Sequence, residues 1–166
     1  MAENILNHDP LTGLLNRTSM QKILSQNDLY KNRDFAIVMC DIDNFKKIND
    51  TYGHDGGDKI LKSLAKILTD NTKGSDVVAR FGGEEFCVVL KKIAKEEAIK
   101  FFVNLRAKVV ENVVMIKDKP VRVTVSIGIS FGKGHCEIDD MLEACDSALY
   151  VAKENGRNRV EIALLL

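Results

Sequence analysis

Hydrophobic positions along this chain follow two periods, and the change from one to the other divides the chain into elements. Residues 35–40 form an uninterrupted apolar run, which is typical of a strand at the centre of a sheet that is covered on both faces. Residues 121–131 alternate apolar with small or polar side chains and form the clearest strand pattern. The shorter runs 76–79 and 87–90 flank segment 80–86, whose two adjacent glycines fit the tight turn of a hairpin.

Helical periodicity fills the intervals between these runs. Asp9 or Thr12 is expected to cap a first helix that ends near Ser25. Residues 41–50 are expected to turn into a short helix after the first long strand. The remaining expected elements are a loop at 51–58, a helix at about 60–69, a turn at 71–75, helices at about 94–112 and 141–156, and a final edge strand at 158–163.

This order of elements predicts an α/β sandwich, in which a mixed sheet of about five strands has helices packed on its faces. The 166 residues are enough for one domain with a substantial core. The composition, 45% hydrophobic and 29% charged, is that of a globular domain, and the sequence contains no internal repeat and no low-complexity tract.

Charge and apolar run length exclude several classes of protein. Lys plus Arg equal Asp plus Glu at 24 each, so no basic field predicts nucleic-acid binding. The longest apolar runs, 35–40 and 162–166, are far shorter than the ~20 residues of a membrane helix. The chain does not open on a basic-then-apolar signal pattern. Cys40 and Cys87 lie in strand-like runs and are expected to be small buried hydrophobes of a reduced, cytoplasmic protein.

Three acidic residues stand where two of the expected strands end. Asp41 follows run 35–40, and Glu84 and Glu85 follow the glycine turn. If these strands pair, the three carboxylates converge, and two of them ~4 Å apart at an effective dielectric of ~20 repel by ~4 kcal/mol, so a proton or a cation is needed. Side-chain alternation directs Glu84 and Glu85 to opposite faces unless the turn distorts the pleat. Two solvated glutamates, with Asp41 as a helix cap, are the alternative that the pattern leaves open.

Segment 82–86, Gly-Gly-Glu-Glu-Phe, resembles the signature of the diguanylate cyclases, the GGDEF or GGEEF domains. Four further blocks look like that family's blocks in the family's order: Asp-x-Leu-Thr-Gly-Leu-x-Asn-Arg at 9–17, Asp-Ile-Asp-x-Phe-Lys-x-Ile-Asn-Asp-x-x-Gly-His-x-x-Gly-Asp at 41–58, Ser-Ile-Gly-Ile-Ser at 126–130 and Asp-x-Ala-Leu-Tyr-x-Ala-Lys-x-x-Gly-Arg-Asn at 146–158. The resemblance implies a nucleotidyl-cyclase or palm-like fold with a signature hairpin. It also implies a single GGDEF-type catalytic domain at 1–166, with 1–8 as a linker remnant.

The implied reaction condenses two GTP molecules into cyclic di-GMP and two pyrophosphates. By similarity, Asp41, Glu84 and the backbone carbonyl of Ile42 would ligate one or two Mg²⁺ (or Mn²⁺) ions, since hard oxygen ligands suit these ions. Asp41, Glu84 and Glu85 would be the catalytic acids. Glu85 would help to deprotonate the attacking 3′-hydroxyl or hold the second ion, and the sequence leaves both roles open.

Two groups of residues match the family's substrate contacts. Asn49 and Asp58 would read guanine, and Asp58 would reject ATP because adenine presents an acceptor at N1. Asp58 is alternatively a first-turn helix residue that the macrodipole favours. The residues matching the phosphate contacts are Lys46, Lys153 and Arg157, together with the backbone amides of Asn44, Phe45 and Lys46.

One position departs from the family pattern. The family's product-inhibition site reads Arg-x-x-Asp, and here the residues are Lys73 and Asp76. Lysine keeps the charge but lacks the planar fork of arginine, so weak or absent product inhibition is expected. The resemblance further implies a homodimer of half-sites and a regulatory domain in a longer chain. A catalytically silent GTP-binding regulatory domain, or an interaction domain that binds metal alone, is the alternative function.

Overall fold

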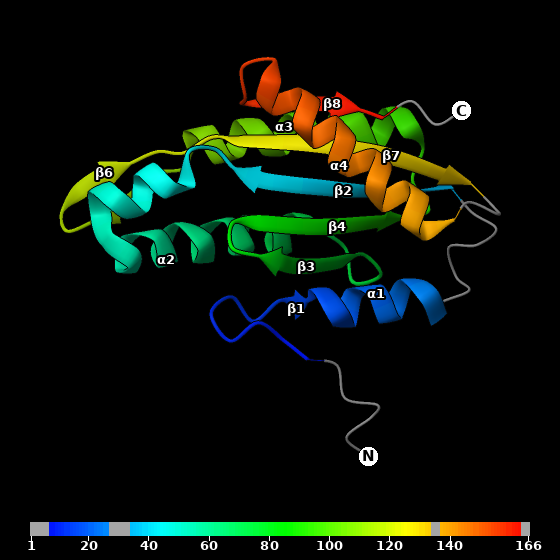
Figure 1. The fold of residues 1–166 in the computed structure, drawn as a ribbon, viewed down its shortest axis with the longest axis horizontal. Helices are drawn as coiled ribbons and strands as arrows, with labels where there is room; N and C mark the ends of the chain where they lie inside the picture. The colour runs from blue at the N-terminus through cyan, green and yellow to red at the C-terminus, as the bar shows by residue number, and fades with distance from the viewer. Residues whose placement is uncertain (1–6, 27–33, 134–136, 164–166) are drawn as a thin grey trace.

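The computed structural model describes residues 7–26, 34–133 and 137–163. Its centre is a mixed six-stranded sheet with strand order β1-β3-β4-β2-β7-β8, and Figure 1 shows these strands one above another, from β8 at the top to β1 at the bottom. The strands are β1 Leu15–Asn16, β2 Asp34–Ile42, β3 Val77–Gly82, β4 Glu85–Lys91, β7 Val125–Lys133 and β8 Arg159–Ile162. The expected α/β sandwich with a mixed sheet is confirmed. The strand beyond the expected five is the two-residue β1, which pairs in parallel with β3.

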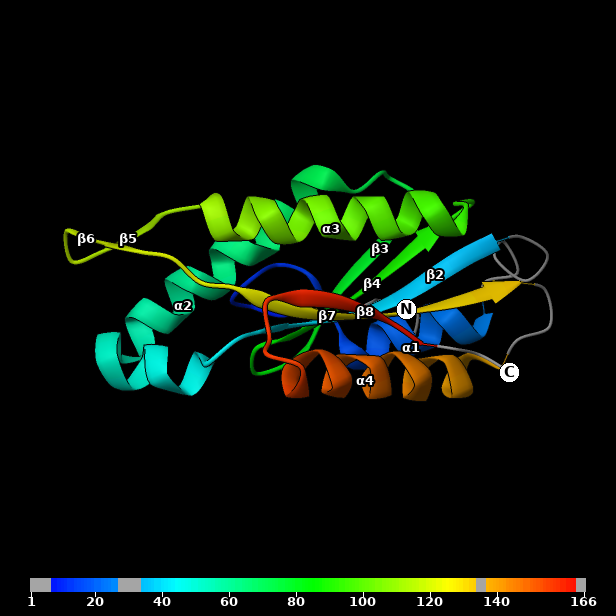
Figure 2. The same ribbon diagram turned by 90° about the horizontal axis from the view of Figure 1, so that it is seen from above.

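Four helices in the described residues cover both faces of this sheet. They are α1 Arg17–Gln26, α2 Phe45–Asn71, α3 Lys95–Glu111 and α4 Ile138–Glu154. Figure 2 shows α2 and α3 on one face and α1 and α4 on the other. The buried side chains accordingly form two clusters, one on each side of the sheet.

Strand β2 lies in the middle of the sheet and joins the two clusters. Its side chains alternate, so that Ala36 and Val38 pack toward α2 and α3 while Ile37 and Met39 pack toward α1 and α4. A strand covered on both faces has no solvated side, which explains why run 35–40 is apolar at every position. The prediction of a central strand here is confirmed.

Helix α2 corrects the prediction of a loop at 51–58. The helix continues through this segment, and only Gly53, at φ 76° and ψ 171°, leaves the helical conformation. A single glycine suffices to redirect the chain because it adopts positive φ at little cost. Gly57 follows in the second part of the helix, where an added Cβ would lie 1.9 Å from Oδ1 of Asn49. The two helical parts therefore pack closely around Gly53.

The strand expected at 121–131 is also shorter than predicted. Strand β7 begins at Val125, and the preceding residues belong to a separate hairpin of β5 Val114–Ile116 and β6 Lys119–Val121. Thr124 lies directly before β7 and outside the main sheet, and its carbonyl accepts the backbone N–H of Asp43 at 2.9 Å. The alternating pattern thus covers two strands in different sheets.

The start of α1 corrects a third prediction. The helix begins at Arg17, and the Oδ1 of Asn16 accepts the backbone N–H of Ser19 at 2.9 Å, so Asn16 is the cap. Asp9 and Thr12 lie in the preceding loop. The interpretation of 1–8 as a linker mostly concerns residues outside the described ones. Within the described part, Asn7 accepts a hydrogen bond from the Ser19 hydroxyl at 2.9 Å.

Close packing between α4 and β7 fixes the position of α4. An added Cβ at Gly128 would lie 2.2 Å from the backbone oxygen of Cys145, so only glycine admits this contact. The buried Ser130 hydroxyl donates to the carbonyl of Met141 at 2.9 Å. The small residues of β7 therefore face the helix, and the C-terminal end of α4, which carries Lys153, is held over the end of β2.

Candidate active site

Strand pairing brings the predicted acids to one end of the sheet. Asp41 is the β2 partner of Glu85 in the antiparallel β2–β4 pair. The backbone N–H of Ile42 donates to the carbonyl of Glu84 at 3.3 Å. The register of β3 and β4 shifts between Arg80 and Gly82, and Gly83 has φ 46°. The turn therefore distorts the regular pleat at the point where Glu84 and Glu85 leave it.

Asp41 is a buried carboxylate that the protein satisfies on one side only. The residue is 4% exposed. The Lys153 ammonium donates to its Oδ2, whereas its Oδ1 is buried and has no hydrogen-bond partner. Burial raises the pKa of Asp41, the Lys153 contact opposes that rise, and the charge of Glu84 adds to it. The carboxylate thus lies in a place that favours added positive charge.

Glu85 is subject to similar forces at the adjacent position. The residue is partly buried. Burial raises the pKa of Glu85, and the charges of Asp146 and Asp41 raise it further, while Lys153 lowers it. Mutual repulsion among carboxylates at this end of the sheet is therefore a property of the folded chain, as the sequence predicted from Asp41, Glu84 and Glu85.

The donor set fits a hard divalent ion, although it does not complete a coordination shell. The described residues contain no group of three or more His, Cys, Asp or Glu side chains that could hold a metal ion. An ion between Asp41 and Glu84 would therefore need further oxygen ligands, such as the Ile42 carbonyl, water or a phosphate. The unpaired Oδ1 of Asp41 is a carboxylate oxygen of the required kind.

The predicted phosphate contacts come from two elements beside Asp41. Asn44, at φ 56° and ψ 36°, precedes the first turn of α2, where Phe45 is buried and Lys46 is exposed. The backbone N–H groups of a first helical turn have no partner within the helix and favour an anion. From the other side, Lys153 reaches Asp41. Arg157 is exposed in the turn that follows α4.

The predicted guanine contacts lie on either side of the break in α2. Asn49 is in the first helical part, and its Oδ1 is buried against Gly57 without a hydrogen-bond partner. Asp58 is partly buried and directly follows Gly57 in the second part. The break at Gly53 brings these two parts together. The region therefore has a second buried polar oxygen without a protein partner.

The two residues at the product-inhibition positions, of which only Lys73 departs from the family pattern, lie in the turn before β3. Lys73 is exposed. Asp76 has its two carboxylate oxygens occupied by backbone N–H groups, of Lys73 at 2.9 Å and of Lys91 at 3.2 Å. Asp76 therefore holds the turn together.

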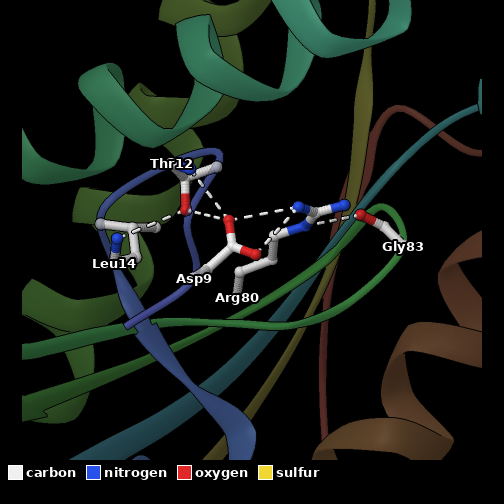
Figure 3. Close-up of polar contacts among 5 residues, drawn as sticks. All are labelled: Asp9, Thr12, Leu14, Arg80 and Gly83. Atoms are coloured by element: carbon white, nitrogen blue, oxygen red, sulfur yellow. Dashed lines mark hydrogen bonds and ion pairs between the residues drawn. The ribbon is translucent and has the colours of Figure 1, made fainter. Parts of the chain in front are cut away.

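Sequence reasoning missed an ion pair that holds the signature turn, drawn in Figure 3. The Arg80 guanidinium lies 3.1 and 3.2 Å from the two carboxylate oxygens of Asp9, and its Nε donates to the carbonyl of Gly83 at 2.9 Å. Asp9 also accepts from the backbone N–H and the hydroxyl of Thr12. Although burial raises the pKa of Asp9, the hydrogen bonds from Thr12 and Arg80 hold it below its usual value. An arginine two residues before the glycines and an acid in the first block were the available signals.

The structure is a mixed α/β domain that gathers acids, cations and a helix start at one end of its sheet, and comparison with known proteins identifies the family. The model of the family described as "Diguanylate cyclase, GGDEF domain" matches residues 6–159. The chain therefore belongs to the GGDEF domain family of the diguanylate cyclases.

Three known proteins illustrate the relationship. The chain is 35% identical to diguanylate cyclase DosC of Escherichia coli over 158 residues, which cover 93% of this chain and 34% of DosC. It is 40% identical to diguanylate cyclase DgcP of Pseudomonas aeruginosa over 158 residues, 93% of this chain and 24% of DgcP. The crystal structure of the GGDEF domain of DgcB from Caulobacter crescentus, in complex with c-di-GMP, superposes with a TM-score of 0.87 at 28% identity, covering 93% of this chain and 94% of that one. The chain thus corresponds to about a third or less of these two curated relatives.

Within the described residues, no helix is both long enough and apolar enough to cross a membrane.

Proposed function

We propose that this chain is a diguanylate cyclase domain that condenses two GTP molecules into cyclic di-GMP and two pyrophosphates. The observation that carries the proposal is the buried Asp41, which pairs opposite Glu85, adjoins Glu84 and keeps one carboxylate oxygen without a partner. A buried oxygen of this kind is costly unless a ligand completes it. The family match favours a guanine nucleotide with its metal ion as that ligand.

Asp41, Glu84 and the carbonyl of Ile42 would hold Mg²⁺ or Mn²⁺. When bound, the divalent ion would stabilise the negative charge that develops on the α-phosphate as pyrophosphate leaves. The chain's own part is to place the Lys153 ammonium beside Asp41, where it opposes the rise in the pKa of that carboxyl, and to exclude water from the buried side of Asp41. Glu85, whose pKa is raised by burial, is suited to accept the proton of the attacking 3′-hydroxyl.

Guanine would be recognised by Asn49 and Asp58. The unpartnered Oδ1 of Asn49 can accept from a guanine N–H group, and the Asp58 carboxylate can accept from guanine N1–H and N2–H₂. Adenine carries an acceptor at N1 and would leave these oxygens unpaired, so GTP is the expected substrate. The triphosphate would lie against the α2 amides of Asn44, Phe45 and Lys46.

Each chain would bind one GTP, so that two chains facing each other complete one reaction centre. Homodimerisation is therefore expected to be necessary for turnover. Because the curated relatives are about three times longer or more, we also propose that this domain works beside a regulatory domain in a longer protein. Since GTP would be the substrate, we expect the activity to be cytoplasmic.

The test is incubation of the chain with GTP and MgCl₂ at several protein concentrations, followed by anion-exchange chromatography. Cyclic di-GMP formed at a rate that rises faster than linearly with protein concentration supports both the chemistry and the pairing. Mg²⁺-dependent GTP binding without product would instead support the silent regulatory domain, which is the alternative. Absence of any GTP binding would contradict both functions.

A further inference from the structure

A second buried carboxylate, Asp43, lies two residues after Asp41. Asp43 is 6% exposed, and both of its oxygens have partners. Its Oδ1 accepts the hydroxyl of Ser126 at 2.6 Å. Its Oδ2 accepts the hydroxyl of Thr124 at 2.6 Å and the backbone N–H of Asn158 at 3.0 Å. One side chain thus joins the end of β2 to the start of β7 and to the turn after α4.

That turn has an unusual backbone conformation. Gly156, Arg157 and Asn158 have φ values of 116°, 64° and 48°, so three consecutive residues are left-handed. Such values are uncommon for residues other than glycine and persist where the surroundings impose them. Two contacts impose them here, because Asp43 accepts the N–H of Asn158 and Arg106 of α3 donates to the Oδ1 of Asn158 at 2.7 Å.

The turn carries the cations that the proposed function assigns to the phosphates. Lys153 lies in the last turn of α4, and Arg157 lies in the turn itself. The backbone N–H of Arg157 donates to the carbonyl of Ala152 at 2.9 Å, which ties the turn to the helix. Any change that releases Asn158 would therefore allow Arg157 to move relative to the end of β2.

We propose that Asp43 is a positioning residue, which locks the turn at 156–158 so that Arg157 faces the triphosphate of the bound nucleotide. The inference rests on the proposed function. Since both Asp43 oxygens are occupied by the protein, Asp43 itself does not contact substrate or metal. Its effect reaches the ligand through the N–H of Asn158.

The test compares two ligands that differ only in their distal phosphates. Isothermal titration with Mg²⁺ and either α,β-methylene GTP, which cannot release pyrophosphate, or GMP measures how much the distal phosphates contribute to binding. Asp43→Ala is expected to weaken binding of the triphosphate about tenfold and of GMP less than about twofold, because charged phosphate contacts are lost and guanine contacts are kept. General damage to the fold would weaken both ligands alike.

Further variants separate the turn from the other contacts of Asp43. Asp43→Asn can still present an oxygen to Asn158 and an amide to the Ser126 hydroxyl, so it should restore most of the triphosphate affinity. Ser126→Ala, which leaves the Asn158 contact intact, should keep both affinities. In an Arg157→Ala background, Asp43→Ala should cause no further loss of triphosphate binding, since the two changes act on one contact.

Arg106→Met keeps the test decisive if Asp43→Ala does not fold. Arg106 is only partly buried, and this substitution removes its hydrogen bond to the Oδ1 of Asn158. It should weaken triphosphate binding by about two- to fourfold. The matched control is Lys100→Met, at an exposed lysine of the same helix α3 to which no described residue is bonded.

Each outcome has a defined meaning. Selective loss of triphosphate affinity in Asp43→Ala or Arg106→Met supports the proposal. Unchanged affinity in both folded variants, with a normally binding parent chain, overturns it and leaves the proposed function standing. A parent chain that binds neither nucleotide overturns the proposed function, and the positioning role with it.

Discussion

Asp41 and Asp43 lie two residues apart at one end of β2, are equally buried, and differ in what the protein gives them. They are 4% and 6% exposed. Asp43 accepts three hydrogen bonds from the chain. Asp41 has one ammonium partner and one oxygen with none. Buried polar groups in folded proteins are nearly always paired, so an exception needs a reason. Asp43 therefore stabilises the fold, whereas the unpaired oxygen of Asp41 is free to bind a ligand.

The surroundings of the two carboxylates agree with this distinction. The groups next to Asp43 are two hydroxyls and an N–H, which satisfy both of its oxygens by hydrogen bonding. Next to Asp41, the charges of Glu84 and of Asp43 itself raise the pKa of Asp41. Across the strand pair, the charge of Asp41 raises the pKa of Glu85. The folded chain thus concentrates repulsion at one place and satisfies the adjoining place fully. Sites of this kind trade stability for binding.

The largest expected effect comes from removing a charge at the unsatisfied end. Glu84→Gln keeps the size and shape of the side chain but removes a ligand charge, so cyclic di-GMP formation should fall about a thousandfold or more. Chromatography of GTP reactions measures it, and circular dichroism verifies the fold. Glu96→Gln, in the first turn of α3, is the matched control and should keep full activity. Full activity of Glu84→Gln would refute the metal assignment.

Breaking the Arg80–Asp9 ion pair should lower the stability of the fold, whereas Glu84→Gln should lower activity. Arg80→Met removes the guanidinium from the Asp9 carboxylate, which keeps its two contacts with Thr12, and removes the side-chain donor to the Gly83 carbonyl. It should lower the free energy of unfolding by about 2 kcal/mol. The control is Lys66→Met, which removes an exposed pair with Asp70 and should cost about 0.5 kcal/mol. Urea unfolding measures both. Equal effects of the two variants would show that the Arg80 pair does not hold the signature turn.

A smaller effect is expected at the altered inhibition site. The Asp76 carboxylate is already bound to backbone N–H groups, and Lys73 offers a single point charge. Lys73→Arg adds a planar fork, so cyclic di-GMP should bind about tenfold more tightly, or by ~1.4 kcal/mol. Isothermal titration of the parent chain and the variant measures the change. Sub-micromolar inhibition of the parent chain by its product would contradict the expectation.

The smallest expected effect is a change in the pH dependence of stability, which tests the repulsion around Asp41 and Glu85. The pKa of Glu85 is raised above its usual value of 4.5, so the folded chain holds this proton more tightly than the unfolded chain does. The stabilisation is complete below pH 4.5 and is lost as pH rises through the folded pKa. Glu85→Gln does not titrate, so its melting temperature relative to the parent chain should rise over this window. A constant difference, as expected for Glu96→Gln, would contradict a perturbed Glu85.

Sequence patterns predicted the elements whose environment is uniform. The run at 35–40 is apolar because both faces of β2 are covered, and the periodicity of 94–112 matches α3 at Lys95–Glu111. The prediction of a loop at 51–58 was wrong because this segment contains the glycines and aspartates that usually mark a loop, yet the helix continues through it and only Gly53 leaves the helical conformation. The hairpin of β5 and β6 was missed because Lys117 and Asp118, rather than glycine, take the positive φ of its turn.

Some features of the candidate site were also predictable from the sequence, and others were not. The convergence of Asp41 with Glu84 and Glu85 was predictable, because strand ends and a glycine turn are visible in the sequence. The contacts of Asp43 were not, since they join residues 81, 83 and 115 positions apart. Nothing local distinguishes an acid that binds such distant partners from an acid that binds none. The roles of Asn49, Asp58 and Arg157 stay predictions that nucleotide binding will test.

The most direct test of the central claim is an electron paramagnetic resonance titration of Mn²⁺ into the chain with α,β-methylene GTP present. The parent chain is expected to bind one or two Mn²⁺ ions in a nucleotide-dependent manner. Asp41→Asn, which removes the charge around the unpartnered oxygen, is expected to abolish that binding while the chain stays folded. Equal Mn²⁺ binding by Asp41→Asn and the parent chain would contradict the claim that the Asp41 carboxylate is a metal ligand.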